Sequence, residues 1–273
     1  MEFRTFEFTG PSGYLYEIRE QNGADEDILS NMSDMKTLMN LTKFIAAIVI
    51  RTNATLTGRL TVEDALNLPV NDRYAIIFNS RIFSLGDEVE FEYDWGNENG
   101  GKVTYGQDLH EFLFDYGTVP TEEELSEKPD AIPFYPEGVK LVDHEYTLTS
   151  GKHIKFDCMT GKGEQAFMKL PMEKQTKNAP LLCRNLHLEV DGKWEKVESF
   201  MPFSAKDMAE MRKYILSIDP VFKGDSHITN PVTGEERTYP VVWAPNFFRG
   251  FFTFAPIVIM FIGYYLFLQL IPT

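Results

Sequence analysis

Apolar and polar residues alternate in short stretches of the first hundred residues, a spacing that predicts β-strands. Near the start, two aromatic-rich stretches flank the turn sequence GPSG at residues 10–13, which predicts a hairpin over residues 3–20. A stricter alternation follows at residues 88–95, where acidic residues alternate with Val89, Phe91, Tyr93 and Trp95. With a return strand at 102–105, this stretch predicts a hairpin that has one apolar and one acidic face.

Apolar spacings of three and four residues predict three longer helices. The first runs from about residue 34 to 51, with Asp34 as its N-cap. The second begins at residue 69 or 71, after a capping box that starts at Thr61, and ends at Gly86. The third begins after Ser204 and runs to about residue 218.

Prolines and glutamates interrupt these periods between about residues 118 and 137, which indicates a boundary. Beyond it, Ser150-Gly151 and Asp191-Gly192 predict further hairpins. The pattern as a whole predicts an α+β fold of two small domains, in which antiparallel hairpins pack with helices. We expect the domains at residues 1–120 and 137–245, an acidic, proline-containing linker at 121–136, and an apolar C-terminal helix within 246–273.

The C-terminal stretch 251–271 holds 21 residues without a charge. As a helix it would be about 32 Å long, enough to cross a hydrocarbon core about 30 Å thick. The same composition describes a helix buried inside a large assembly. The residues expected to contact lipid or partner proteins are Phe251, Phe252, Phe254, Ile257, Ile259, Phe261, Tyr264, Leu266, Leu268 and Ile271.

The formal net charge of −15 makes nucleic acid an unfavourable partner. The acidity is local, because residues 86–145 contain 17 acidic residues against three lysines. We therefore predict an acidic docking surface, formed by Glu88, Glu90, Glu92 and Asp94, for a basic partner. Arg73 and Arg81, eight positions apart and so on nearly the same helical face, are the residues that a neighbouring copy could offer to it. The alternative is that the acidic residues form only a solvated face and an acidic linker, with no docking role.

No catalytic or metal-binding motif can be assembled from the chain. The two cysteines, Cys158 and Cys183, are too far apart for a CxxC pair, and Gly161-Lys162-Gly163 lacks the spacing of a P-loop. The five histidines show no zinc-ligand spacing, although His144 and His153 could face each other across a hairpin. We therefore predict a protein that is not an enzyme and that uses no cofactor or metal.

Two groups of short motifs resemble the T-even-type phage baseplate hub and tail assembly proteins. The first group comprises residues 48–51, 60–66 (LTVEDAL), 68–74 (LPVNDRY) and 81–86 (RIFSLG), which precede the acidic hairpin. The second comprises residues 214–220 (YILSIDP), the hairpin at 230–235 and the stretch 247–249 (FFR). Members of this family often carry CxxC pairs in the two hairpins. The corresponding stretches here, 93–99 and 227–230, have no cysteine, so no zinc role is carried over.

The resemblance implies a structural or assembly component of a contractile phage tail baseplate or hub, or of a related injection machine. Its implied partners are other hub proteins or the tape-measure protein. The chain could also form a homo-oligomer. The resemblance implies that the protein is located in the virion tail, and in the host cytoplasm during assembly. The C-terminal helix would be buried in the hub or delivered to the host inner membrane.

Two other classes of function stay open. A cellular adaptor anchored by its tail would use the acidic body to recruit a cytoplasmic partner. A membrane-tethered enzyme would need a site assembled from dispersed residues.

Overall fold

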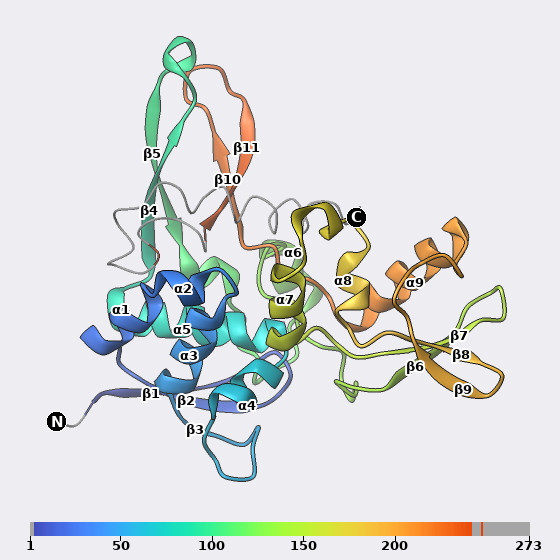
Figure 1. Ribbon diagram of the computed structural model, residues 1–273. Coiled ribbons are helices and arrows are strands. Elements are labelled where there is room, and N and C mark those ends of the chain that lie inside the picture. The colour runs from blue at the N-terminus through green and yellow to red at the C-terminus, as the bar shows by residue number, and fades with distance from the viewer. Residues whose placement is uncertain (1–2, 242–246, 248–273) are drawn as a thin grey trace.

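A three-stranded antiparallel sheet and five helices form the first part of the molecule. The computed structural model describes residues 3–241 and Phe247. The strands β1 (Thr5–Thr9), β2 (Leu15–Arg19) and β3 (Val49–Thr52) pair in that order. The helices are α1 (Gly23–Leu29), α2 (Met32–Met35), α3 (Met39–Ile48), α4 (Val62–Asn67) and α5 (Val70–Leu85). In Figure 1, α1, α2, α3 and α5 lie above the sheet and cover one of its faces.

Two hairpins project together from this part of the molecule (Figure 1). The first consists of β4 (Glu88–Asp94), the 3-10 turn η1 (Asn97–Asn99) and β5 (Lys102–Asp108). The second consists of β10 (Asp225–Thr229) and β11 (Glu236–Pro240), from the other end of the described chain. We call the two hairpins together the arm. The 3-10 turn η2 (Leu109–Phe112) and the helix α6 (Glu122–Glu127) follow β5.

A four-stranded antiparallel sheet organises most of the second half. Its order is β6 (His144–Thr147), β7 (His153–Phe156), β8 (His187–Val190) and β9 (Lys193–Lys196). The remaining elements are α7 (Gly161–Met168), η3 (Met172–Lys174), α8 (Ala179–Leu182) and α9 (Ala205–Ile218). In Figure 1 this sheet and α9 lie on the right, away from the arm.

Within the described residues, buried apolar side chains form two large clusters. The first contains Phe44, Ile45 and Phe78, all at 0% exposure, and packs the helices onto the first sheet. The second is built around Ile154, Phe156 and Met211. The two clusters do not correspond to the two halves of the chain. The first cluster also contains Phe222, Ile228, Val241 and Phe247, which come from the end of the described chain.

The stretch predicted as a linker contributes to both clusters. Its helix α6 begins with a capping box in which Thr121 and Glu124 bond each other's backbone amides. After it, Ile132 is fully buried in the first cluster and donates its amide hydrogen to Phe112 O at 2.9 Å. Tyr135 belongs to the second cluster. This stretch therefore packs against both halves of the described chain.

The α+β class, the hairpins and most helix limits agree with the sequence-based expectations. Thr61 forms the predicted capping box, and Ser204 forms one at the predicted start of α9. The helix expected over 34–51 is wrong at both ends. Asn31 caps the short α2, Leu38 adopts a left-handed backbone (φ 57°) before α3, and the chain leaves the helix at Val49 to pair with β2. The residues from Val49 to Thr52 are mostly β-branched, which favours a strand.

Candidate functional site

The acidic hairpin and the last hairpin of the described chain form one structural unit. The ring of Phe91 in β4 stacks on Tyr239 in β11, with centroids 4.3 Å apart and planes inclined by 9°. Arg237 donates from Nη1 to the Tyr93 hydroxyl at 2.7 Å, and its guanidinium lies over the Trp95 ring. These contacts join the inner faces of two hairpins that would each be marginal alone.

Hydrogen bonds near the tip complete this connection. Tyr105 donates its hydroxyl hydrogen to the carbonyl oxygen of Thr229 at 2.8 Å. Asn230 donates from Nδ2 to the carbonyl oxygen of Asn99 at 3.0 Å, which joins the two turns. The arm is thus held at its middle by aromatic rings and at its end by polar groups.

The opposite face of β4 carries the predicted acidic residues. Glu88, Glu90, Glu92 and Asp94 are all exposed, whereas Val89 and Phe91 between them are buried. The cross-strand neighbours of the four acidic residues in β5 are Asp108, Gly106, Thr104 and Lys102. Lys102 Nζ reaches Glu92 at 3.7 Å. The exposed acidic face of this hairpin is therefore as predicted, while its docking role stays a prediction.

Arg73 and Arg81 do not lie on the surface, which corrects the prediction that a neighbouring copy could offer them to the acidic face. Their exposed fractions are 3% and 2%. Arg73 donates to Ala65 O at 2.7 Å and to Thr42 Oγ1 at 3.1 Å, and its Nε lies 3.4 Å from Glu164 Oε2. The two arginines were expected on a solvated face, but α5 is buried on nearly all sides.

Arg81 instead connects α5 to the base of the arm. Its guanidinium donates to the carbonyl oxygens of Gly86 and Glu88, the latter at 3.0 Å. These bonds fix the short connection between the end of α5 and the start of β4. Arg81 therefore helps to position the acidic strand.

The first turn of α5 binds three separate parts of the chain through consecutive polar residues. Asn71 donates from Nδ2 to Pro220 O at 2.9 Å and to Pro133 O at 3.3 Å. The carboxylate of Asp72 accepts hydrogen bonds from Ser12 N and Oγ, at 2.9 and 2.5 Å, and from the Tyr16 hydroxyl at 2.6 Å. With Arg73, these residues form what we call the polar junction.

Burial raises the pKa of the Asp72 carboxyl to about 6. The hydrogen bonds from Ser12 and Tyr16 favour the charged form and act in the opposite direction, but desolvation outweighs them. Asp72 therefore titrates near neutral pH inside the core of the first half.

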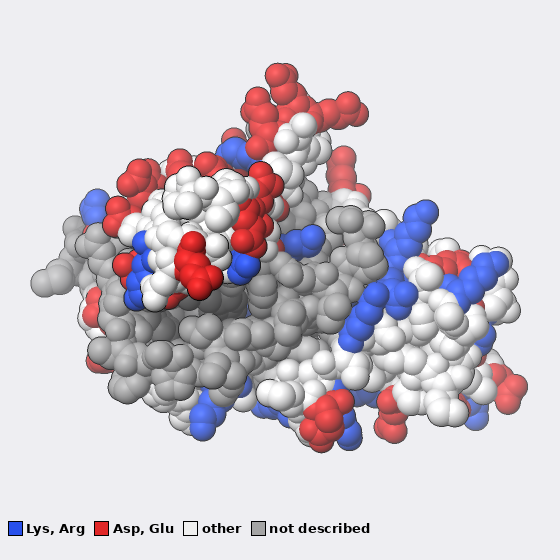
Figure 2. Space-filling model, turned by 90° about the horizontal axis from the view of Figure 1, so that it is seen from above, with Lys and Arg blue, Asp and Glu red and all other residues white. Residues whose placement is uncertain are grey.

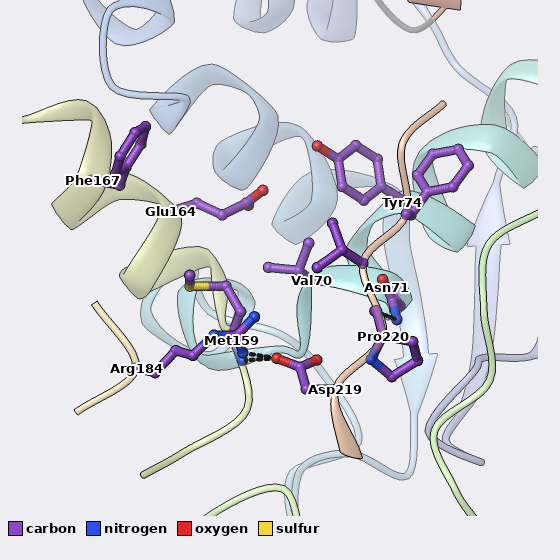
Figure 3. A pocket seen from close by; sticks show the side chains of 11 residues that line it. Val70, Asn71, Tyr74, Met159, Glu164, Phe167, Arg184, Asp219 and Pro220 are labelled. Atoms are coloured by element: carbon purple, nitrogen blue, oxygen red, sulfur yellow. Dashed lines mark hydrogen bonds and ion pairs between the residues drawn. The ribbon is translucent and has the colours of Figure 1, made fainter. Parts of the chain in front are cut away.

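A small cavity lies beside the polar junction (Figure 3), with room for about 30 Å³. Val70, Asn71 and Tyr74 line it from α5, Glu164 and Phe167 from α7, and Pro220, Val221 and Phe222 from the stretch after α9. Arg184 and Asp219 form a buried ion pair at its edge, and Asp219 also accepts the amide hydrogen of Met159 at 2.7 Å. This volume suits about one water molecule and is far below that of a ligand pocket.

Cys158 and His144 form a contact that the sequence did not predict. The sulfur lies 3.6 Å from His144 Nε2, and both residues are buried. Burial raises the pKa of the Cys158 thiol to about 11 and lowers the pKa of His144, so both groups are neutral at pH 7. This pair is therefore not an activated nucleophile. His153 lies elsewhere on the sheet and bonds Glu189 at 2.8 Å, so the possible pair with His144 does not form.

Asp87, Asp108 and His110 come together at the base of the arm. One potential ligand atom from each lies within 4.8 Å of the others, and all three side chains are exposed. Backbone hydrogen bonds explain this placement, because Leu109 N donates to Asp87 O and His110 N donates to Asp108 Oδ1. The sequence analysis missed the group, since only the pairing of β4 with β5 brings Asp87 close to the other two.

No family model, curated protein or solved structure matches this chain. The resemblance to phage hub proteins therefore stays a prediction.

The predicted C-terminal helix lies outside the described residues. This applies to every residue expected to contact lipid or partner proteins, from Phe251 to Ile271. Among residues 3–241, no helix is long and apolar enough to cross a membrane.

Proposed function

We propose that this chain is a structural or assembly component of a contractile phage tail, in the baseplate or hub, or of a related injection machine. The arm is the observation that supports this proposal most directly. Two hairpins from distant parts of the sequence are fixed together and project from the body, and one of them exposes an acidic face. A projecting, charged element of this kind favours a role in contacts with other proteins.

The resemblance on which the proposal rests includes two hairpins, and these two hairpins are in contact in this chain. In the resembling family, the two hairpins that often carry CxxC pairs correspond to residues 93–99 and 227–230 of this chain. Here these stretches lie side by side and are joined by the hydrogen bond from Asn230 to Asn99. In this chain, polar and aromatic contacts provide the connection between the hairpins.

Under this proposal the arm binds a basic surface of another hub protein or of the tape-measure protein. The apolar C-terminal segment would be buried in the hub or would enter the host inner membrane when the tail contracts. The protein would occupy the virion tail, and the host cytoplasm during assembly. We propose no catalytic step, cofactor or bound metal for it.

Co-purification with the products of neighbouring genes tests the proposal. Tape-measure, sheath or hub genes beside this one would supply the candidate partners. The full chain is compared with the variant Glu88→Lys/Glu90→Lys/Glu92→Lys in the arm and with the control Glu122→Lys/Glu123→Lys/Glu127→Lys in α6, whose side chains are equally exposed. We expect the arm variant to lose the partner and the α6 variant to retain it. Equal retention by both would contradict the docking role.

The alternative function is a cellular adaptor anchored by its tail, and the uncharged stretch 251–271 favours it. Its test is sedimentation of the full chain with cell membranes, compared with the variant Ile259→Asp/Leu266→Asp. The adaptor is supported if the full chain sediments with membranes, the variant does not, and the protein is absent from purified tails. This combination would overturn the phage proposal. Presence in purified tails would overturn the adaptor.

A further inference from the structure

Charge is divided unevenly along the chain. Residues 1–136 contain 25 acidic and 10 basic residues, whereas residues 137–273 contain 16 of each. The whole net charge of −15 thus belongs to the half that includes the acidic hairpin. The second half is neutral overall and can offer basic groups to an acidic surface.

A lysine-bearing segment follows α7 in that second half, and we call residues 169–177 the lysine segment. Lys169, Lys174 and Lys177 are exposed, and Met172 between them is 77% exposed. Within the described part of the chain, none of the three lysines has a carboxylate at ion-pair distance. By contrast, Lys152 and Lys155, which come earlier in the second half, are both paired with aspartates.

The backbone of the lysine segment is held to the body. Lys174 N donates to Pro171 O at 2.8 Å, and Gln175 donates from Nε2 to Leu170 O at 2.9 Å. Leu170 packs with Phe167 in a small buried cluster. The segment is therefore a fixed surface that carries Met172, three lysines and one exposed glutamate, Glu173. Lys169 donates from Nζ to Gln165 Oε1 at 2.9 Å.

In Figure 1 the lysine segment, which connects α7 to α8, lies beside the arm and is separate from β4 and β5. Seen from above in Figure 2, Asp and Glu side chains surround the arm, and Lys and Arg side chains gather in the right-hand part of this face. Among the described residues, no ion pair joins the lysine segment to Glu88, Glu92 or Asp94. The two complementary surfaces can meet when they belong to different copies of the chain.

We propose that the acidic face of the arm of one copy docks on the lysine segment of a second copy. This inference rests on the docking role proposed for the arm and names its partner. The projecting arm reaches the neighbour, the three lysines face its acidic strand, and Met172 adds an apolar contact. Because different surfaces of the two copies meet, the contact is heterologous and closes into a ring or continues as a filament.

Sedimentation velocity of the full chain in a nonionic detergent, at 50 and 500 mM NaCl, tests this contact. We expect association at low salt and at least tenfold weaker association at high salt, because charges at a surface contact are screened. The variants Glu88→Lys/Glu90→Lys/Glu92→Lys and Lys169→Glu/Lys174→Glu/Lys177→Glu should each lose association. An equimolar mixture of the two should restore it, because each variant then offers a surface complementary to the other. Circular dichroism confirms that each variant is folded.

The matched control is Lys193→Glu/Lys196→Glu/Lys206→Glu, which makes the same charge change at other exposed lysines and should associate like the parent chain. A monomer at both salt concentrations, or association that the lysine-segment variant leaves unchanged, would overturn the inference. Loss of binding to phosphatidylserine vesicles in that variant, with self-association unchanged, would assign the segment to a membrane instead. If tail proteins still co-purify through the arm while no self-association occurs, this inference fails and the proposed function stands.

Discussion

Asp72 shows how one buried carboxylate connects a helix to a turn. It accepts three hydrogen bonds from Ser12 and Tyr16, and so fixes the first hairpin against the start of α5. Gly10 is part of this arrangement, because a Cβ at that position would lie 2.7 Å from the Tyr16 ring and 3.1 Å from the Asp72 carboxyl. The turn therefore needs a residue without a side chain at position 10.

The raised pKa of Asp72 predicts a stability that depends on pH. Its folded-state pKa of about 6 lies above the ordinary 3.8, so the folded protein binds this proton more tightly than the unfolded chain does. This contribution to the free energy of unfolding is fully present below about pH 4 and is lost as the pH rises through 6. Relative to Asp72→Asn, the parent chain should gain about 1 kcal/mol between pH 7 and pH 5. Urea unfolding of both proteins at the two pH values measures the difference, and a constant difference would contradict the assignment.

At the scale of elements, the arm depends on packing between strands that are distant in sequence. Each hairpin forms through its own turn, but the apolar face of β4 is covered by β11. Isolated two-stranded hairpins are marginal in water. The pairing of Phe91 with Tyr239 is therefore expected to stabilise both hairpins.

A double-mutant cycle on Phe91→Leu and Tyr239→Leu measures this coupling. We expect an interaction energy of about 1 kcal/mol, because stacked rings contribute roughly this amount beyond their buried area. Hydrogen exchange should also become faster in β10 and β11 when Phe91 alone is changed. Additive effects of the two substitutions, with unchanged exchange in the second hairpin, would show that the hairpins are stable independently.

The elements were largely predictable because their signals are local. The alternation of Glu88 to Trp95, the turn at Asp191-Gly192 and the cap at Ser204 each act within a few residues. The pairing of the two hairpins was not predictable, because Tyr105 and Thr229 are 124 positions apart. Likewise, the spacing of Arg73 and Arg81 indicates a shared helical face but carries no information about what covers that face. Here other helices and the base of the arm cover it.

At the scale of the whole molecule, the polar junction is where the two large apolar clusters meet. Val70 N donates to Met159 O at 3.0 Å, and Gly161 N donates to Leu68 O at 3.2 Å, so the stretches before α5 and α7 are joined through their backbones. Asp219 pairs with Arg184 on the other side of the cavity. These bonds link the halves through groups whose burial is costly unless every charge has a counterpart.

Replacing Asp219 with Asn tests whether this connection makes the two clusters unfold together. An asparagine can still accept the amide hydrogen of Met159, so the substitution removes mainly the negative charge that faces the buried Arg184. We expect a loss of about 3 kcal/mol in the free energy of unfolding. The exposed control Asp191→Asn, which tolerates the positive φ of 50° at that position, should change it by less than about 0.5 kcal/mol.

The double variant Arg184→Met/Asp219→Asn should recover part of the loss, because it removes both charges of the buried pair. Urea unfolding followed by both tryptophan fluorescence and circular dichroism should give one shared transition for the parent chain. If Asp219→Asn shifts only one of the two signals, the clusters are coupled through this ion pair and separate without it. If it costs no more than Asp191→Asn, the pair does not stabilise the junction, and the backbone bonds at Val70 and Gly161 hold the halves together.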